Sequence, residues 1–334
     1  MNIEFFSVQS IKKISIAIIV AIMIALVVPV KMKRIWAATL PFNPNPIFAN
    51  VERFTTLLDR DPTDIYLPIT GDIKPQRDLL PVALLLQGAN VDKSNYSHFA
   101  TILAQYGFIV IVPNHLRKFP PMPILGKYIL LPEQHQIINV LAYMKAAYSD
   151  SSSPIFESID LDKLVLIGHS MGGLVGINAI QNNCNFPLCF GSFHRPAALM
   201  GGVFYGTNLK GHFRMVIHPI INSGIPIALI QGTLDSESTP KDTEATYQKI
   251  QDSPKALFTI VGANHYAITN TNNPVNIPPI QADPIEPLLD QEKAIKSIAR
   301  WSALFLRAYV MHDQGALDYL NRPADNDYET VIIN

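Results

Sequence analysis

The chain has 334 residues, of which 48% are hydrophobic and 16% charged, so it has ample apolar material for one sizeable globular core. Its formal net charge of −1 provides no basic surface of the kind that nucleic acids require, which argues against DNA or RNA binding. With two cysteines and no His or Cys residues at ligand spacing, the sequence predicts neither a structural zinc site nor another cofactor.

The first 36 residues differ in character from the rest of the chain. An uncharged apolar run over residues 14–30 has basic residues on both sides. At about 1.5 Å per residue, a helix of this length reaches roughly 25 Å, the lower limit for crossing a bilayer. A signal peptide and an uncleaved membrane anchor both fit, and the poor cleavage site at Ile35-Trp36-Ala37 favours the anchor. We therefore expect an exported protein, either held in the membrane or released after cleavage.

Beyond a proline-rich linker expected over residues 37–50, one folded domain is expected over residues 51–334. The sequence predicts strands and helices in alternation, with strands over 82–87, 108–113, 164–167, 197–204, 225–230 and 256–261, and helices over 95–106, 131–148, 170–181, 239–252 and 291–311. Near-continuous apolar strands that alternate with helices are typical of an α/β fold, with a mostly parallel central sheet covered by helices on both faces.

The segment Gly168-His169-Ser170-Met171-Gly172 is the most informative part of the chain. It follows the apolar run 164–167 and precedes a helix of small residues. A strand that reverses into a helix within one residue strains the backbone at the serine and projects its hydroxyl above the sheet edge, as in a nucleophile elbow. Because a hydroxyl is a weak nucleophile at neutral pH, Ser170 then needs a base and a carboxylate that orients that base.

The candidates for base and acid lie further along the chain. His265 is in a loop directly after a predicted strand and can reach across the top of the sheet, whereas His312, at the end of the last predicted helix, fits a solvated position better. Asp235 is the first carboxylate after another predicted strand, and Glu237 is the alternative acid. The sequence therefore predicts a triad of Ser170, Asp235 and His265.

Two backbone amides are candidates for an oxyanion hole, the pair of N–H donors that stabilises the negative oxygen of a tetrahedral intermediate. Met171 follows the predicted nucleophile, and Ala89 lies in the turn Gln87-Gly88-Ala89-Asn90 that ends an early apolar strand. An ordinary glycine turn is the alternative interpretation at Ala89.

Cys184 and Cys189 have four residues between them, in a loop after the helix that follows Ser170. A local disulfide and two free buried thiols are both compatible with this spacing. If the two cysteines pair, the domain is expected in an oxidising compartment.

These residues resemble the α/β-hydrolase superfamily, and within it the esterase branch that includes dienelactone-hydrolase-like, chlorophyllase-like and platelet-activating-factor-acetylhydrolase-like enzymes. The resemblance extends over residues 60–320 and rests on the order of the elements and on several short sequences, namely 168–173, 232–235, His265, Leu161-Asp162-Lys163 and Ile298-Ala299-Arg300-Trp301. Many relatives have His-Gly where this chain has Gln87-Gly88. The oxyanion donor expected in this loop is a backbone amide, so the change from histidine to glutamine affects local hydrogen bonding more than it affects that donor.

The resemblance implies a serine hydrolase that cleaves carboxylic esters through an acyl-enzyme on Ser170, with a small-molecule or lipid-like ester as substrate. An acyltransferase would use the same triad, and a catalytically silent, membrane-anchored binding protein would keep the fold without the reaction. The apolar stretches 119–125 and 213–221 fit either a lid or acyl-binding wall, or ordinary packing, and neither identifies the substrate.

Overall fold

The computed structural model describes residues 45–69, 79–118, 128–210, 216–277, 281–322 and 329–333. The apolar run 14–30 and the stretch 119–125 lie outside these described residues. Among the helices that are described, none combines the length and the apolar character that a bilayer crossing requires. The described end of the linker belongs to the packed region, since the amides of Ile47 and Phe48 both donate to the carbonyl of Gln105.

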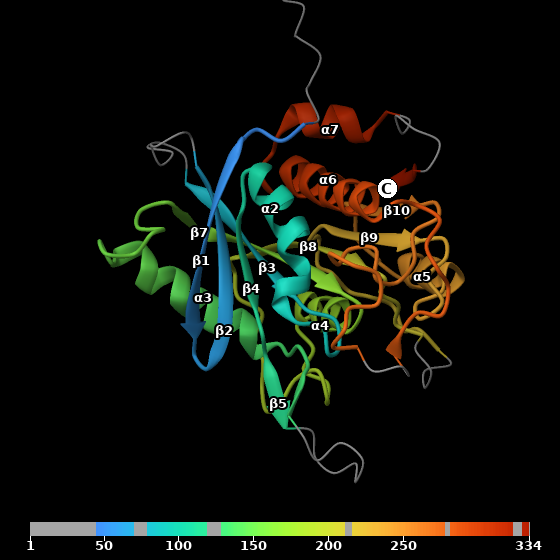
Figure 1. Ribbon diagram of the computed structural model, residues 1–334, viewed down its shortest axis with the longest axis horizontal. Helices are drawn as coiled ribbons and strands as arrows, with labels where there is room; N and C mark the ends of the chain where they lie inside the picture. Colours follow the sequence, from blue (N-terminus) through green and yellow to red (C-terminus); the bar gives the residue numbers. More distant parts are fainter. Residues whose placement is uncertain are drawn as a thin grey trace, which may run out of the picture. The chain divides into compact units, whose positions relative to one another are not determined.

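A nine-stranded sheet forms the centre of the described region, in the order β1-β2-β4-β3-β7-β8-β9-β10-β11 (Figure 1). Its strands are β1 Asn50–Leu58, β2 Asp61–Ile69, β3 Leu80–Leu86, β4 Ile109–Pro113, β7 Ile159–His169, β8 Leu199–Tyr205, β9 Ile227–Gly232, β10 Lys255–Ile260 and β11 Glu329–Ile333. The run from β4 to β10 is parallel, whereas β1, β2 and β11 join antiparallel at the two sides. The predicted α/β fold with a mostly parallel sheet is confirmed.

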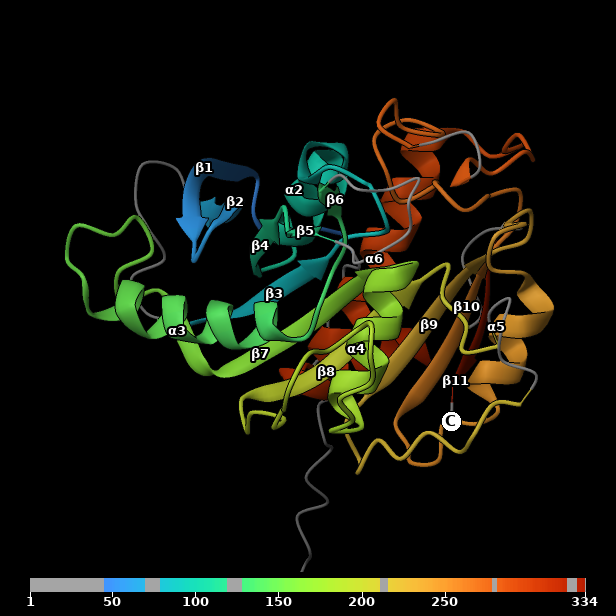
Figure 2. The ribbon, with the colours of Figure 1, turned by 90° about the horizontal axis from the view of Figure 1, so that it is seen from below.

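Helices cover both faces of this sheet (Figure 2). The described helices are η1 Lys93–Tyr96, α2 Ser97–Gln105, α3 His135–Ser149, α4 Met171–Ile180, α5 Pro240–Tyr247, α6 Gln291–Val310 and α7 Gln314–Leu320. Helices α2 and α6 pack together on one face, and α3 and α4 lie on the other. Two successive residues of β8 show this division, because a Cβ added to Gly201 would meet α6 and one added to Gly202 would meet α4.

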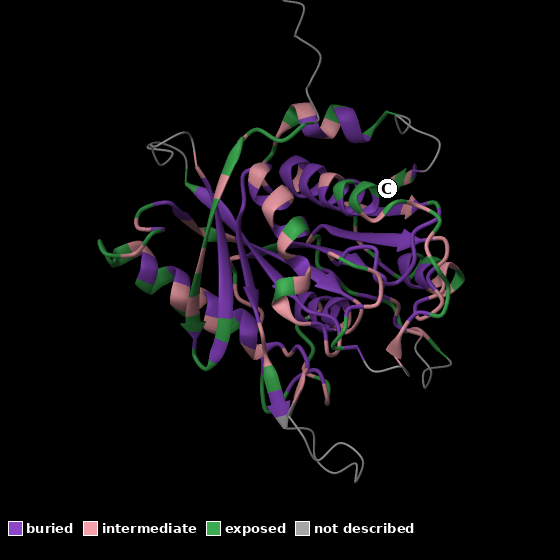
Figure 3. Ribbon diagram, in the orientation of Figure 1, coloured by how far each residue is buried: buried purple, intermediate pink, exposed green. Residues whose placement is uncertain are grey.

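The middle of the sheet is buried on both sides (Figure 3). Every residue of β3, β4 and β9 is buried, which explains why these strands are continuous apolar runs in the sequence. On the face covered by α6, Phe258 stacks on Trp301 with 5.0 Å between the ring centroids. The loops of the candidate site follow the carboxyl ends of this buried sheet.

The strand order reverses beside β3. The chain leaves β3, forms β4 on one side of it, and returns as β7 on the other side. Leu86, the last residue of β3, pairs with Gly168 near the end of β7. Ligands of open parallel sheets bind outside the carboxyl ends of the strands at such a reversal. The loops that carry Ala89 and Ser170 therefore meet where a ligand site is expected.

Candidate active site

Ser170 is the single residue between the end of β7 and the start of α4. Its φ of 52° and ψ of −117° lie in a region that residues other than glycine rarely adopt. The turn is held by close packing, because a Cβ on Gly172 would overlap the carbonyl oxygen of Leu86. It is also held by the hydroxyl of Thr207, which donates to the carbonyl of Ser170 at 2.9 Å. The backbone thus has the strained geometry expected of a nucleophile elbow.

The imidazole of His265 is paired with the carboxylate of Asp235. Its Nδ1 lies 3.0 Å from Oδ1 and 2.9 Å from Oδ2, and the two side chains are 5% and 0% exposed. The loop holds the carboxylate in turn, since the amide of Ser238 donates to Oδ1 at 2.7 Å. A carboxylate at Nδ1 keeps the proton of the neutral imidazole there, so Nε2 is left as the basic nitrogen.

The electrostatic surroundings of His265 favour its protonated form. Burial alone would lower the pKa of this imidazole, but the charge of Asp235 and the hydrogen bond to it outweigh burial. The charges of Glu237 and Asp283 act in the same direction, and the pKa of His265 lies above its ordinary value. Such surroundings stabilise the imidazolium that forms when a histidine takes a proton from a serine.

Ser170 and His265 line one pocket of about 120 Å³. The other lining residues are Gly88, Ala89, Val91, His169, Glu237, Tyr266 and Gln281. The amides on either side of Ala89 are used within the protein, because Gly88 donates to the hydroxyl of Tyr96 and Asn90 donates to the carbonyl of Leu130. The loop therefore has a fixed conformation that presents Ala89 to the pocket.

Met171 is the first residue of α4. The first amides of a helix have no carbonyl one turn earlier to bond, so they point out of its N-terminus. The amides of Met171 and Ala89 thus belong to the two segments that the oxyanion-hole prediction requires, one after the serine and one in the loop after β3.

His169, directly before Ser170, connects the two loops of the site. Its ring is fully buried, with Nε2 2.9 Å from the carbonyl oxygen of His265 and Nδ1 2.9 Å from the hydroxyl of Tyr96. A carbonyl only accepts, so Nε2 carries the proton and Nδ1 accepts from Tyr96. Burial, together with the charge of His265, lowers the pKa of His169 well below its ordinary value, and the ring stays neutral.

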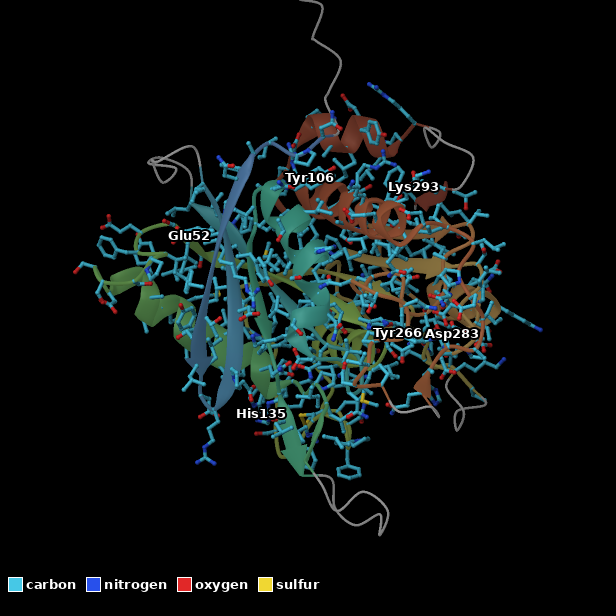
Figure 4. The ribbon with its side chains drawn as sticks, in the orientation of Figure 1. Glu52, Tyr106, His135, Tyr266, Asp283 and Lys293 are labelled. Atoms are coloured by element: carbon cyan, nitrogen blue, oxygen red, sulfur yellow. A yellow bond between two sulfur atoms is a disulfide. The ribbon has the colours of Figure 1, made fainter. Side chains whose placement is uncertain are left out.

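Asp283 connects the loop of Asp235 with the loop of His265. This buried carboxylate accepts hydrogen bonds from the amide of His265 at 2.9 Å, the hydroxyl of Ser236 at 2.8 Å and the amide of Ile285 at 2.9 Å. Figure 4 shows it beside Tyr266, the residue after His265. The sequence analysis missed Asp283, because it lies in a proline-rich loop that follows no predicted strand.

The structure thus brings Ser170, Asp235, His265, Ala89 and Met171 to one edge of the sheet. The two alternatives that the sequence left open are placed differently. The carboxylate bonded to His265 is Asp235, while Glu237 lies in the pocket lining, and His312 follows the end of α6 outside this pocket.

The described part of the stretch 213–221 lies away from Ser170. Val216 and Ile217 line a different cavity, together with Asn178 and Gln181 at the C-terminal end of α4. Ser170 is at the opposite end of the same helix, so these two residues do not form a wall over it. Residues 213–215 lie outside the described residues.

Cys184 and Cys189 form a disulfide, with 5.1 Å between their Cα atoms. The bridge closes the loop after α4, and that loop carries Phe186 and Phe190 with their rings edge to face. Of the two alternatives for the cysteines, the structure therefore contains the disulfide. The compartment of the protein stays a prediction.

The parallel sheet, the strained turn at Ser170 and the pairing of His265 with Asp235 together define the class of α/β-hydrolases. A family model described as Chlorophyllase matches residues 72–193, a segment that contains Ala89, Ser170 and both cysteines. Chlorophyllase type 0 of Chenopodium album is 32% identical over 104 residues, which cover 28% of this chain and 26% of that protein. The match thus spans about a quarter of the relative's length.

These comparisons support the chlorophyllase-like branch of the α/β-hydrolases, as the resemblance in the sequence predicted. A protein of this branch is an esterase or a related hydrolase. The family match ends at residue 193, so Asp235 and His265 lie beyond it, and what relates them to Ser170 is the contact between their side chains and the pocket that His265 shares with Ser170.

Proposed function

We propose that this protein is a serine esterase that cleaves a carboxylic ester through an acyl-enzyme on Ser170. The proposal is carried by one observation. Ser170, on its strained turn, shares a pocket with His265, and the Nδ1 of that histidine is hydrogen-bonded to the buried carboxylate of Asp235. No cofactor is needed for this chemistry, since nucleophile, base and oxyanion donors all come from the chain.

In the proposed first step, Nε2 of His265 takes the proton of Ser170 as its Oγ attacks the carbonyl carbon of the ester. The carbonyl oxygen becomes negative, and the amides of Met171 and Ala89 donate hydrogen bonds to it. Asp235 stabilises the imidazolium and keeps its ring oriented. When the tetrahedral intermediate collapses, His265 returns the proton to the leaving alkoxide, and the alcohol departs.

The second step repeats this sequence with water. His265 takes a proton from a water molecule that attacks the acyl-enzyme, the same amides stabilise the second oxyanion, and Ser170 leaves with the proton. An acyltransferase would differ in this step alone, with an alcohol in place of water. Product analysis with added alcohol distinguishes the two reactions.

The test is ester hydrolysis by the full chain and by the variant Ser170→Ala. We expect the substitution to reduce p-nitrophenyl acetate hydrolysis by at least about a thousandfold, because the nucleophile is lost. Ser151→Ala, at an exposed serine after α3, is the matched control and is expected to keep full activity. A fluorophosphonate probe should label Ser170 in the wild-type chain. Equal hydrolysis by wild type and Ser170→Ala would refute the proposal.

We also propose that the N-terminal run 14–30 exports the domain or anchors it in the membrane. The charge-free run and the disulfide between Cys184 and Cys189 support this proposal. Fractionation of expressing cells, with protease added from outside, is the test. A domain that stays in the soluble, protease-protected fraction would contradict it.

A further inference from the structure

We infer that the disulfide between Cys184 and Cys189 controls the rate of the proposed reaction, because it holds in place the loop that carries Ala89. The closed disulfide supports full ester hydrolysis, and its reduction lowers the rate. This inference rests on the proposed esterase function and names a regulation of the same site.

Three segments, far apart in the sequence, carry this connection. The candidate oxyanion loop is residues 87–90, and the disulfide loop is residues 183–190. The connecting segment, residues 130–134, runs from the end of β6 Tyr128–Leu130 to the start of α3. Hydrogen bonds join the connecting segment to both loops, so it links them physically.

The disulfide loop holds the connecting segment at Gln134, which is fully buried. The amide of Gln134 donates to the carbonyl of Leu188 at 3.1 Å, and its Nε2 donates to the carbonyl of Asn183 at 2.7 Å. Asn183 directly precedes Cys184, and Leu188 directly precedes Cys189. Each of the two acceptors is therefore next to a bridged cysteine, and the disulfide constrains the distance between them.

Phe190, directly after Cys189, makes a second contact with the connecting segment. The guanidinium of Arg117 lies 4.4 Å from the centroid of the Phe190 ring, within the range of a cation–π contact. Nη1 of the same buried arginine donates to the carbonyl of Pro132 at 3.2 Å. The disulfide loop thus supports the connecting segment at two positions.

The connecting segment in turn holds both ends of the candidate oxyanion loop. The amide of Asn90 donates to the carbonyl of Leu130 at 2.7 Å. The amide of Leu131 donates to the carbonyl of His115 at 3.0 Å, and the amide of His115 donates to the side chain of Gln87 at 3.1 Å. A shift of the connecting segment is therefore transmitted to residues on both sides of Ala89.

A small shift of this loop is enough to affect the rate. An oxyanion donor acts at about 2.7–3.1 Å from the negative oxygen, and a displacement of about 1 Å caused by a distant change can cost about a hundredfold in rate. Opening the disulfide removes the covalent constraint beside Gln134. Because the oxyanion exists only in the transition state and the intermediate, kcat should respond more than KM.

A dithiol reductant can reach this disulfide, since Cys184 is half-buried and the next two residues are exposed. The reductant's thiolate attacks Sγ of Cys184, the S–S bond breaks, and Cys189 leaves as a thiolate that water protonates. The second thiol of the reductant then displaces Cys184 from the mixed disulfide. The protein gains two electrons and two protons, and the reductant becomes a disulfide.

The test compares the oxidised full chain with the chain reduced by dithiothreitol and then freed of reductant under nitrogen. We expect reduction to lower kcat for p-nitrophenyl acetate by about three- to thirtyfold, with KM changed by less than about twofold. The inhibition constant of 1,1,1-trifluoroacetone, whose adduct with Ser170 uses the same donors, should rise by a similar factor. Far-UV circular dichroism should stay constant. A loss of kcat that parallels a loss of this signal would indicate general unfolding and overturn the inference.

Two variants locate the effect. The double variant Cys184→Ser, Cys189→Ser should have the kcat of the reduced chain and should not respond to dithiothreitol. Gln134→Ala removes the contact with Asn183 and leaves the disulfide intact. We expect it to lower kcat of the oxidised chain and to reduce the oxidised-to-reduced ratio of kcat by at least about twofold. The matched control, Gln251→Ala, alters an exposed glutamine after α5 and should keep the wild-type ratio.

The outcomes separate the two claims. If Ser170→Ala abolishes hydrolysis but the oxidised and reduced chains have equal kcat, the regulation is wrong and the esterase proposal stands. An effect of reduction that is the same in Gln134→Ala as in the wild type would overturn the connection through Gln134. If Ser170→Ala hydrolyses the ester as fast as the wild type, the proposed function fails and the inference fails with it.

Discussion

The imidazole of His169 donates a hydrogen bond from Nε2 to the carbonyl oxygen of His265, over 2.9 Å. The residue before the candidate nucleophile thereby holds the backbone of the candidate base. On its other side, His169 accepts from Tyr96, whose hydroxyl accepts from the amide of Gly88 in the oxyanion loop. One neutral, buried ring therefore connects the three segments whose relative positions decide whether the proposed triad can work.

Substitution of His169 by alanine is expected to impair the reaction through geometry. It leaves the hydroxyl of Tyr96 and the carbonyl of His265 without their partner, at a cost of about 1–3 kcal/mol in unfolding free energy. Displacement of the base should lower kcat by about 10- to 100-fold with a smaller change in KM. Urea unfolding and steady-state kinetics measure the two effects.

The conservative variant His169→Asn separates positioning from general destabilisation. Its amide group can donate to one neighbour and accept from the other, so we expect partial recovery of kcat relative to His169→Ala. If both variants lose the same unfolding free energy and neither loses kcat, the hydrogen bond from His169 to the carbonyl of His265 does not position the proposed base.

Substitution of Asp235 by asparagine should change both the rate and its pH dependence. Loss of the carboxylate removes the group that orients His265, and we expect kcat to fall by about three to four orders of magnitude. The charge of Asp235 raises the pKa of His265, and the reaction needs the neutral imidazole. The acidic limb of the kcat/KM profile should therefore move to lower pH in the variant.

Asp242→Asn is the matched control for Asp235→Asn. Asp242 forms an ion pair with Lys210 near the start of α5 and does not line the pocket. We expect its pH–rate profile to coincide with that of the wild type. An unshifted acidic limb in Asp235→Asn would mean that another group controls it.

The parallel centre of the sheet could be predicted from the sequence, whereas its edges could not. Strands such as β3 and β9 are buried on both faces, so their apolar runs identify them. Most residues of β1 are exposed or half-buried, and β2 contains Pro62 and Pro68, which are typical of loops. β2 pairs with β4, which is distant in the chain, and β1 joins the sheet by forming a hairpin with β2, so an apolar pattern within either strand does not show these pairings.

Long-range contacts also explain two helix boundaries that the sequence misplaced. The helix predicted from residue 131 begins at His135, because the amide of Leu131 bonds to the carbonyl of His115. The helix predicted to end at residue 252 ends at Tyr247, because the amide of Gln251 bonds to the carbonyl of Ile220.

The residues of the candidate site also fall into those that the sequence could indicate and those that it could not. Ser170, Asp235 and His265 each follow an apolar strand within a few residues, so their residue types and their positions along the chain are enough to indicate them. Tyr96 and Asp283 have no such local pattern, and their contribution comes from partners far away in the chain. His169 lies within the motif itself, but only the fold shows what its two nitrogens contact.

Asp283 should be sensitive even to an isosteric change. In Asp283→Asn the amide NH₂ group would face either the N–H of His265 at the position of Oδ2, or the N–H of Ile285 and the hydroxyl of Ser236 at the position of Oδ1, so at least one donor loses its acceptor. We expect a loss of about 1–3 kcal/mol in unfolding free energy, with a lower kcat because the base loop is released. Asp252→Asn, whose carboxylate accepts at an exposed turn, is the control and should cost much less.

A second histidine, His115, which does not line the pocket at Ser170, links stability to pH. Nδ1 of His115 lies 2.8 Å from Asp61, and Nε2 lies 3.4 Å from Glu133. The amide of the same residue donates to the side chain of Gln87, next to the oxyanion loop. Burial would lower the pKa of His115, but the two carboxylates outweigh burial and raise it to about 9.

Because this pKa is higher in the folded chain than its ordinary value, the stabilisation from His115 is complete below about pH 6.5 and is lost as the pH rises through about 9. We expect it to amount to about 3 kcal/mol between pH 6 and pH 10. Urea unfolding of His115→Gln should show a correspondingly smaller decrease over this range than the wild type. His98→Gln, at an exposed histidine 3.8 Å from Glu292, should follow the wild-type curve. If stability falls with pH equally in His115→Gln and in the wild type, the ion pairs of His115 with Asp61 and Glu133 contribute nothing to stability. The loop after Gln87 would then depend on uncharged contacts such as the hydrogen bond from the amide of His115.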